Sequence, residues 1–349
     1  MGLDQVTGSL EKVDAFSGLK ARPKKASTAV NYLLVGSDTR EGLSWVELKA
    51  LRVGSTASAA GKRSDTMLLV HISKARDKAV IISLPRDTLV TIPARTTSTG
   101  KIISATKAKL NAAFNWGDAP LLIEVIESMT NLRIDHYIEI NFAGFAHMVD
   151  ALGGIQVCSK VAIKDPNSHL VLSAGVHTLN GIESLKYVRT RDFDGMGDLG
   201  RMQRQQQFMS SVIRKATSSG VLLNPVKLVN FLNAALSTVK TDSTLRSGDL
   251  LDLAKQLRNL SSSKVRTLTV PLSNVNHNEP GIGSTVIWDP ILAPDLWMRL
   301  RQDKAVVDVV VPTPSASPSA PTASPSPSAV IVDKFKTRTA KENPCGALK

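Results

Sequence analysis

Three apolar runs rich in β-branched residues dominate the first third of the chain. They are VNYLLVG at 30–36, DTMLLVHIS at 65–73 and KAVIISLP at 78–85. Runs of this length and composition are typical of buried strands. Because only the link SKARD joins the second run to the third, we expect these two to form an antiparallel hairpin. The pattern therefore predicts the start of a β-sheet.

Helical spacing appears further along the chain and alternates with strand patterns. A helix is predicted over 118–132, a strand over 135–141, and a second helix over 142–154 that ends at glycines. The same reasoning predicts helices at 180–188, 198–218, 224–238, 246–260 and 290–302, and short strands near 266–271 and 285–288. The alternation predicts one mixed α/β domain over residues 30–306.

The segments on either side of this domain have a different pattern. Residues 1–29 are polar and basic without a clear period, and are interpreted as a lead-in segment. A Pro/Ser-rich linker is predicted over 307–329, because residues 312–329 hold six prolines and six serines without a charge. A short C-terminal tail, 330–349, is expected to be separated from the domain by this linker.

Composition narrows the class of partner. The 349-residue chain is 42% hydrophobic, which is enough for a large core, and its net charge of +13 favours anionic partners. Aromatic residues are only 4%, which argues against a surface on which nucleic-acid bases stack. The basic residues are dispersed, and no helix-turn-helix or zinc-finger pattern occurs, so a nucleic-acid-binding regulator is disfavoured. No apolar stretch of membrane-spanning length is found, so the given chain is expected to lack a membrane anchor.

A first polar cluster is expected where the three predicted strands end. If the first two strands are antiparallel, Asp38 and Asp65 meet at one end of the sheet, and the third strand brings Arg86 and Asp87 to the same end. Two carboxylates beside arginines suit a divalent cation, Mg²⁺ or Mn²⁺, that bridges them to a phosphate. Alternatively, both aspartates are turn or cap residues that bind nearby amides and arginines such as Arg40.

A second polar cluster lies in the segment YVRTRDFDGMGDLGRMQRQQQFM. Arg189 and Arg191 share a face only if that piece is extended, whereas Asp198, Arg201 and Gln205 have the spacing of one helical stripe. A helix that begins near Asp198 would offer free amides to an anion, and arginines bind phosphate oxygens in pairs. The alternative is a solvated helix face with Asp198 as an ordinary N-cap.

Taken together, five ordered motifs resemble the LytR-CpsA-Psr family. They are VGSDTR at 35–40, RSDTMLLVHI at 63–72, SLPRDT at 83–88, KLNAAF at 109–114 and YVRTRDFDGMGDLGRMQRQQ at 187–206. The resemblance implies a three-layer α/β/α fold with a central mixed, largely antiparallel sheet. It also implies a hydrophobic cavity that binds a polyprenyl lipid, with the lipid's pyrophosphate at the mouth.

The resemblance also implies roles for individual residues. The metal ligands and acid-base carboxylates would be Asp38 and Asp65, which with Arg86 and Arg191 form the catalytic group. The pyrophosphate would be bound by Arg40, Arg86, Arg189, Arg191, Arg201 and Gln205. Asp87, Asp198 and Arg204 would support them. The implied cofactor is Mg²⁺, with Mn²⁺ as a substitute.

The implied activity is that of a phosphotransferase, which moves a glycopolymer from a polyprenyl-pyrophosphate carrier to a peptidoglycan hydroxyl. Two alternatives stay open, a polyprenyl-pyrophosphate pyrophosphatase and a non-catalytic polyprenyl-phosphate-binding protein. The expected place of action is the extracytoplasmic face of the membrane, or the cell wall, of a Gram-positive bacterium. The membrane surface is then a partner, and nucleic acid is not.

The two cysteines, Cys158 and Cys345, are too far apart in sequence for a paired metal site. A single disulfide and two free thiols are both compatible with the sequence. An extracytoplasmic location, as the family resemblance implies, is oxidising and would favour a disulfide between the two.

Overall fold

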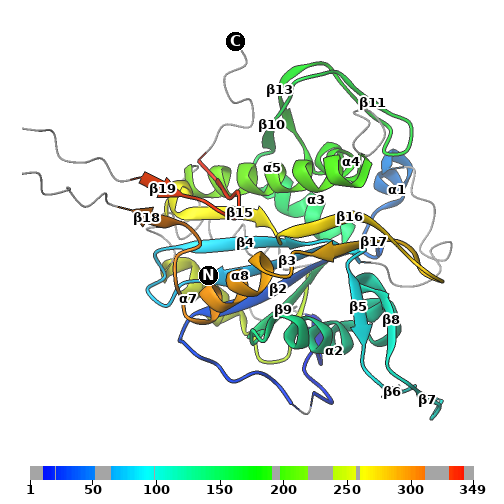
Figure 1. Cartoon of the computed structure of the whole chain (residues 1–349). Helices are drawn as coiled ribbons and strands as arrows, with labels where there is room; N and C mark the ends of the chain where they lie inside the picture. The colour runs from blue at the N-terminus through cyan, green and yellow to red at the C-terminus, as the bar shows by residue number, and fades with distance from the viewer. Residues whose placement is uncertain are drawn as a thin grey trace, which may run out of the picture.

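An eight-stranded sheet forms the centre of the molecule (Figure 1). The computed structural model describes residues 11–19, 21–51, 64–97, 99–190, 197–218, 239–256, 260–310 and 330–341. In spatial order the strands are β1 (Glu11–Val13), β14 (Val239–Asp242), β9 (His136–Ile140), β2 (Val30–Ser37), β3 (Ser64–Ile72), β4 (Ala79–Leu84), β15 (Val265–Thr269) and β20 (Arg338–Thr339).

The sheet is mixed, and four of its seven neighbouring pairs are antiparallel, namely β14–β9, β2–β3, β3–β4 and β15–β20. The pairs β1–β14, β2–β9 and β4–β15 are parallel. The three apolar runs of the sequence are β2, β3 and β4, each antiparallel to the next. The predicted mixed, largely antiparallel sheet is therefore confirmed.

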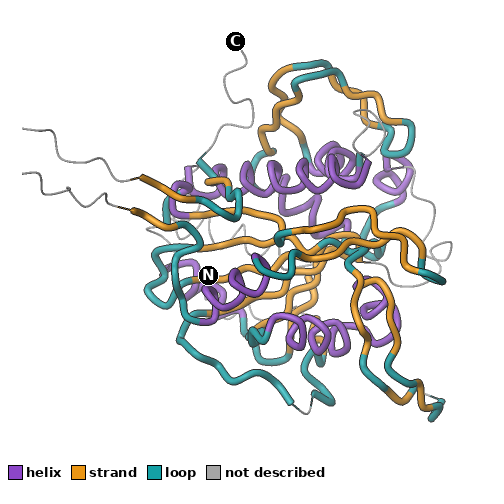
Figure 2. Tube along the Cα trace, in the orientation of Figure 1, coloured by secondary structure: helices purple, strands orange, loops and turns teal. Residues whose placement is uncertain are grey.

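Helices cover both faces of the sheet. Side chains along each strand point alternately to opposite faces, so the apolar strands present apolar groups on both faces for helices to cover. Leu33 and Val35 of β2 pack into the larger core cluster with α2 (Leu110–Thr130) and α8 (Leu292–Arg301). Leu34 lies on the other face, where its cluster includes Met209 and Ile213. That face is covered by α3 (Phe142–Ala151), α4 (Gly181–Arg189), α5 (Gly197–Ser218) and α7 (Ser247–Gln256). Figure 2 shows helices on both sides of the strands, so the three-layer fold is confirmed.

Predicted and observed helices agree closely except at α2, which begins at Leu110 instead of 118. The helix bends at Gly117 and Asp118, where the φ of Asp118 is +51°, so the predicted start is the bend. The predicted helix at 224–238 lies outside the described residues. None of the helices in the described ranges is long and apolar enough to cross a membrane.

Short strand pairs, mostly missed by the sequence pattern, extend from this framework. They are β5 (Leu89–Ile92) with β8 (Thr106–Lys109), β6 (Arg95–Thr96) with β7 (Ile102–Ile103), β10 (Ile155–Ser159) with β13 (Gly175–Leu179), β11 (Ile163–Asp165) with β12 (Leu170–Leu172), β16 (Leu272–Glu279) with β17 (Gly283–Trp288), and β18 (Asp308–Val310) with β19 (Val330–Val332). Two further helical turns are α1 (Trp45–Leu51) and η4 (Ser262–Lys264).

Both ends of the described chain join the sheet, which differs from the sequence expectation. β1, in the predicted lead-in segment, pairs with β14 at one edge, and β20, in the predicted separate tail, pairs with β15 at the other. The tail also inserts Phe335, 5% exposed, into the core. Sheet edges present unpaired backbone groups, and this explains why polar segments with little periodicity dock there.

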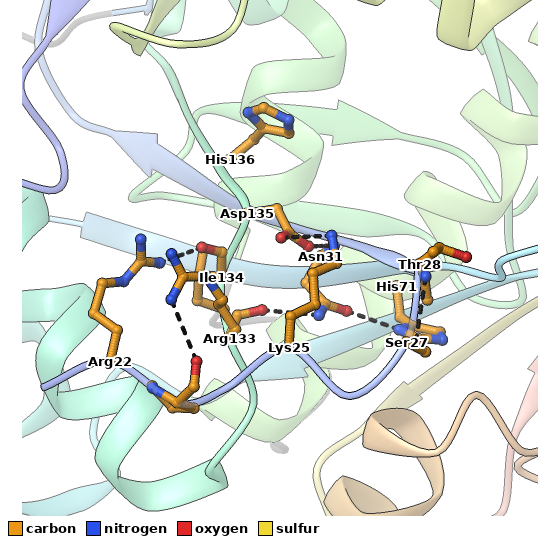
Figure 3. A network of polar contacts seen from close by, with 12 residues as sticks. Arg22, Lys25, Ser27, Thr28, Asn31, His71, Arg133, Ile134, Asp135 and His136 are labelled. Carbon is orange, nitrogen blue, oxygen red and sulfur yellow. Dashed lines mark hydrogen bonds and ion pairs between the residues drawn. The ribbon is translucent and has the colours of Figure 1, made fainter.

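A polar network holds the lead-in segment against β2 and β9 (Figure 3). The two oxygens of Asp135 accept from Lys25 Nζ and from the backbone N–H of Asn31, each at 2.8 Å. The Asn31 amide donates to the Arg133 carbonyl, and its oxygen lies 2.7 Å from Nδ1 of the buried His71. These bonds fix the start of β2, so its far end can carry functional groups at a defined position.

Candidate active site

A cavity of about 500 Å³ lies between β2, β3 and the helices α3, α4 and α5. Most of its wall is apolar, and we call it the apolar cavity. Its apolar lining is Leu34, Val35, Leu68, Ile140, Phe142, Phe145, Met148, Leu185, Val188, Phe208, Met209 and Val212. Tyr187 lies beside this cavity. Burial raises the pKa of its hydroxyl to about 12, although the charge of Arg204 acts to lower it, so the tyrosine stays neutral. The cavity suits a flexible apolar ligand.

Cationic and polar groups stand on one part of this wall. Arg189, at the end of α4, lies with its guanidinium 5.2 Å from the ring centre of Phe142. Arg201 and Gln205 line the same wall from the first turns of α5. The Gln205 amide donates to the Val188 carbonyl at 3.2 Å, which ties α5 to α4. The predicted helical stripe of Arg201 and Gln205 is therefore present, and Arg189 joins it through tertiary packing.

A smaller cavity of about 280 Å³ adjoins the first. Much of its wall is apolar, but it carries the charged groups of Arg86, Asp87 and Lys109, and for these we call it the polar cavity. Four residues line both cavities, namely Thr66, Leu68, Arg201 and Gln205, and we call the three polar ones, Thr66, Arg201 and Gln205, the rim. Beyond these four, the polar cavity is lined by Met67, Ser83, Leu84, Pro85, Arg86, Asp87, Lys109, Val275, Ser284 and Val286.

The ends of β2, β3 and β4 converge beside the rim, as the sequence predicted. Gly36 of β2 pairs with Thr66, and Ser37 pairs with Ser64, so Asp65 is the extra residue of a β-bulge. Asp38 directly follows the end of β2. The backbone thus places both aspartates at one end of the sheet, although the Asp65 side chain lies outside what the structure describes.

The loop that carries Arg86 and Asp87 is held by backbone bonds from two other elements. The Asn111 N–H donates to the Arg86 carbonyl at 3.0 Å, and the Val286 N–H donates to the Asp87 carbonyl at 2.9 Å. The Asp87 carboxylate lies 3.3 Å from Nε of Arg86 and 3.1 Å from Nζ of Lys109. Charged groups on a loop fixed in this way need little reorganisation to bind an anion or a hydroxyl group.

A buried network supports the C-terminal end of α4. Thr190, fully buried, donates its hydroxyl to the Lys186 carbonyl at 3.0 Å and therefore accepts from Ser168, whose oxygen is 2.9 Å away. Nη2 of Arg204 donates to the Thr190 carbonyl at 2.6 Å. The Asp165 carboxylate accepts from the Ser168 N–H at 3.2 Å. The network therefore joins the β11–β12 turn, α4 and α5 beside Arg189.

Some of the predicted site residues fall outside this arrangement. Arg40 follows β2 but lines neither cavity. Arg191 lies outside the described residues, and Asp198 is placed on α5 by its backbone alone. Cys158 is disulfide-bonded, but Cys345 lies outside the described residues, so their pairing stays a prediction.

Sequence reasoning assigned no role to several polar residues of the two cavities, among them Lys109, Thr66, Asn167 and Ser168. Lys109 belongs to the KLNAAF motif, so a signal was present although no role was assigned to it. Thr66 lies within the motif RSDTMLLVHI, and no role was assigned to it either. Asn167 and Ser168, which line the apolar cavity, come from a turn without any recognisable pattern. Only tertiary contact brings that turn to α4.

Carboxylates at the strand ends are of the ligand type that Mg²⁺ takes. Mg²⁺ binds hard oxygen ligands and is usually held by one or two carboxylates together with substrate phosphates. Among the side chains that the structure describes, no group of three or more His, Cys, Asp or Glu could form an all-protein metal site. The residues that could hold the ion are Asp38 and Asp65, on adjacent strand ends.

The chain is similar in sequence to known proteins. The model of the LytR_cpsA_psr family matches residues 4–286. A relative from Corynebacterium glutamicum, "Probable cell wall biosynthesis protein LcpB", is 35% identical over 84% of this chain and 65% of its own length. A second from Bacillus cereus, "Polyisoprenyl-teichoic acid--peptidoglycan teichoic acid transferase TagU", is 30% identical over 74% of each chain.

The fold is also similar to solved structures. "TagT bound to LI-WTA" is 25% identical, covers 85% of this chain and 98% of its own, and superimposes with a TM-score of 0.58. Two corynebacterial relatives are longer than this chain, which spans 65% and 51% of their lengths.

Proposed function

Because the chain belongs to the LytR-CpsA-Psr family, we propose that it transfers a glycopolymer from a polyprenyl-pyrophosphate carrier to a peptidoglycan hydroxyl. The observation that carries the proposal is the apolar cavity with Arg189, Arg201 and Gln205 on its wall. A lipid diphosphate has the matching composition, with an apolar chain and an anionic end.

The apolar cavity supports the lipid part of the proposed donor. Its volume of about 500 Å³ lies within the usual range for ligand pockets. Burial of an isoprenoid chain against Phe142, Phe145 and Phe208 removes apolar surface from water, at about 25 cal/mol for each Å². A lipid-linked donor would place the protein at the extracytoplasmic membrane surface, where peptidoglycan is also found.

The arginines support the pyrophosphate part. Arg201 is only 4% exposed, and a guanidinium in such a site interacts with phosphate oxygens more strongly than it would in water. Arg189 and Arg86 approach from α4 and from the loop after β4. In the proposed complex, Arg191 completes this group.

The proposed step is a displacement at the phosphorus next to the glycan. The acceptor hydroxyl oxygen forms a bond to that phosphorus, and the bond to the oxygen that bridges the two phosphates breaks. The proton of the hydroxyl passes to a carboxylate at the strand ends, and polyprenyl phosphate leaves. A Mg²⁺ ion held by Asp38 and Asp65 would neutralise charge on the phosphate oxygens. The arginines orient the diphosphate and stabilise the charge that develops on the leaving oxygen.

The names of the relatives support the choice of acceptor and polymer class. The Bacillus cereus relative is named as a teichoic acid–peptidoglycan transferase, and the Corynebacterium glutamicum relative is named for cell wall biosynthesis. By similarity, this chain would attach a wall glycopolymer to peptidoglycan.

The proposal is tested by incubating the protein with a synthetic polyprenyl-pyrophosphate glycan and short peptidoglycan oligomers. We expect mass spectrometry to detect a phosphodiester-linked glycan on the acceptor, with loss of product when Mg²⁺ is chelated. Asp65→Ala should abolish transfer, and Arg201→Lys should lower kcat/KM by about tenfold or more because the two-point contact is lost. The matched control is Arg246→Lys, at an exposed arginine before α7.

Three other results would contradict the proposal. Released glycan phosphate without ligation would indicate a pyrophosphatase. Lipid binding without turnover would indicate a carrier protein. Equal losses of kcat/KM in Arg201→Lys and Arg246→Lys would show that the rim has no part in the mechanism.

A further inference from the structure

The two cavities lie on opposite sides of the rim. In the sheet the strand order is β9, β2, β3, β4. The apolar cavity extends over β9 and β2 to Ile140 and Leu34, whereas the polar cavity extends to the end of β4 at Ser83 and beyond it to Asp87. Thr66 on β3 and the first turns of α5 stand between the two. A diphosphate bound at the rim therefore faces one cavity on each side.

Phosphoryl transfer places the attacking and leaving oxygens roughly in line, on opposite sides of the phosphorus. The leaving group of the proposed reaction is polyprenyl phosphate, whose chain would occupy the apolar cavity. The attacking hydroxyl must then come from the other side of the rim. We infer that the polar cavity is the binding site for the acceptor saccharide, an inference that rests on the proposed function.

Two charged groups of the polar cavity, Asp87 and Lys109, can bind a saccharide. Asp87 can accept a hydrogen bond from a sugar hydroxyl, and Lys109 can donate to a neighbouring sugar oxygen. The two side chains form an ion pair at 3.1 Å and remain 21% and 29% exposed, so a ligand can reach both. A volume of about 280 Å³ is smaller than that of most ligand pockets, which favours one sugar ring of the acceptor over a longer segment.

The β16–β17 hairpin forms one wall of the polar cavity through Val275, Ser284 and Val286. It is fastened to the Asp87 loop by the backbone bond from Val286 and by a parallel bridge between Val286 and Thr88. At its far end, Glu279 pairs with Lys107 of β8 at 2.8 Å. The hairpin therefore sets the width of the cavity and, with it, the acceptors that fit.

The experiment compares Lys109→Met with Lys101→Met in the transfer assay. Lys109 lines the polar cavity, whereas Lys101 is an exposed lysine directly before β7 that lines neither cavity. We expect Lys109→Met to raise the acceptor KM by about tenfold or more, because a charge-assisted hydrogen bond to the acceptor is lost. The KM for the lipid-linked donor should change by less than about threefold. Lys101→Met should change neither KM.

A second variant tests the volume of the cavity independently of charge. Val275→Trp enlarges a side chain that is 44% exposed, so the fold should tolerate it, while the cavity is partly filled. It should also raise the acceptor KM selectively. If both variants raise the donor KM instead, the polar cavity holds the donor glycan and the inference is wrong. Unchanged acceptor KM in both variants would equally overturn it. A wild-type protein without transfer activity would refute the proposed function itself, a result distinct from these.

Discussion

Thr190 shows how one hydroxyl can fix the end of the helix α4, which carries Arg189. It lies between Arg189 and Arg191 in sequence, and its side chain joins Ser168 to the Lys186 carbonyl. Its own carbonyl accepts from Arg204. Since Thr190 touches no cavity, we consider it a positioning residue.

Thr190→Val keeps the shape of the side chain but leaves the Ser168 hydroxyl without its acceptor. We expect kcat to fall on the order of tenfold with little change in donor KM. A small displacement of the arginines should weaken their contacts to the transition state more than their contacts to the bound donor. Thr190→Ser should restore activity. The matched control is Thr217→Val on α5, whose hydroxyl also donates to a helix carbonyl. Equal losses of kcat in both valine variants would indicate a purely structural effect.

At the scale of elements, the packing of α4 on α3 depends on the absence of one side chain. A Cβ at Gly181, the first residue of α4, would lie 2.3 Å from the Ala146 carbonyl oxygen of α3. The N–H of Gly181 also donates to Asp150 at 2.8 Å. Because α4 ends at Arg189, this contact fixes the helix that carries part of the site.

Gly181→Ala should therefore lower the free energy of unfolding by about 2 kcal/mol, the cost typical of overpacking in a well-packed contact. Denaturant unfolding at constant m-value measures this. Gly248→Ala in α7 is the control, because no atom lies within 4 Å of the added Cβ and alanine is the better helix former. If Gly181→Ala were as stable as the control, the close approach of the two helices would be refuted.

At the scale of the whole molecule, the C-terminal segment completes the domain. β20 covers one edge of the sheet, the Ala340 N–H donates to the Val265 carbonyl at 2.9 Å, and Phe335 is buried in the core formed with α8. The Pro/Ser-rich stretch is therefore followed by residues that belong to the same folded unit.

Phe335→Ala should lower the free energy of unfolding by about 3 kcal/mol, as expected for truncation of a buried aromatic side chain. Val332→Ala, at a residue that is 45% exposed in the same segment, should have an effect below about 1 kcal/mol. Thermal or denaturant unfolding of both variants decides the point. If the tail were independent of the domain, the two variants would have the same free energy of unfolding.

The sequence by itself determined the elements whose patterns are local. The apolar runs at 30–36, 65–73 and 78–85 became β2, β3 and β4, and the short link at 73–77 fixed the β3–β4 hairpin. These features brought Asp38, Asp65 and Arg86 to one end of the sheet, and the spacing of Arg201 and Gln205 placed both on one helical stripe. Hydrophobic period and link length suffice for this because both act over a few residues.

Only the tertiary structure decided which distant segments meet. Lys109 reaches Asp87 because β8 packs beside the loop after β4, and Ser168 reaches Thr190 across 22 residues. The short strands from β5 to β8, the β16–β17 hairpin and the docking of β20 have too few residues for a recognisable period. Their stability comes from neighbours far away in the sequence, and the two cavities, together with the rim between them, are products of the same long-range packing.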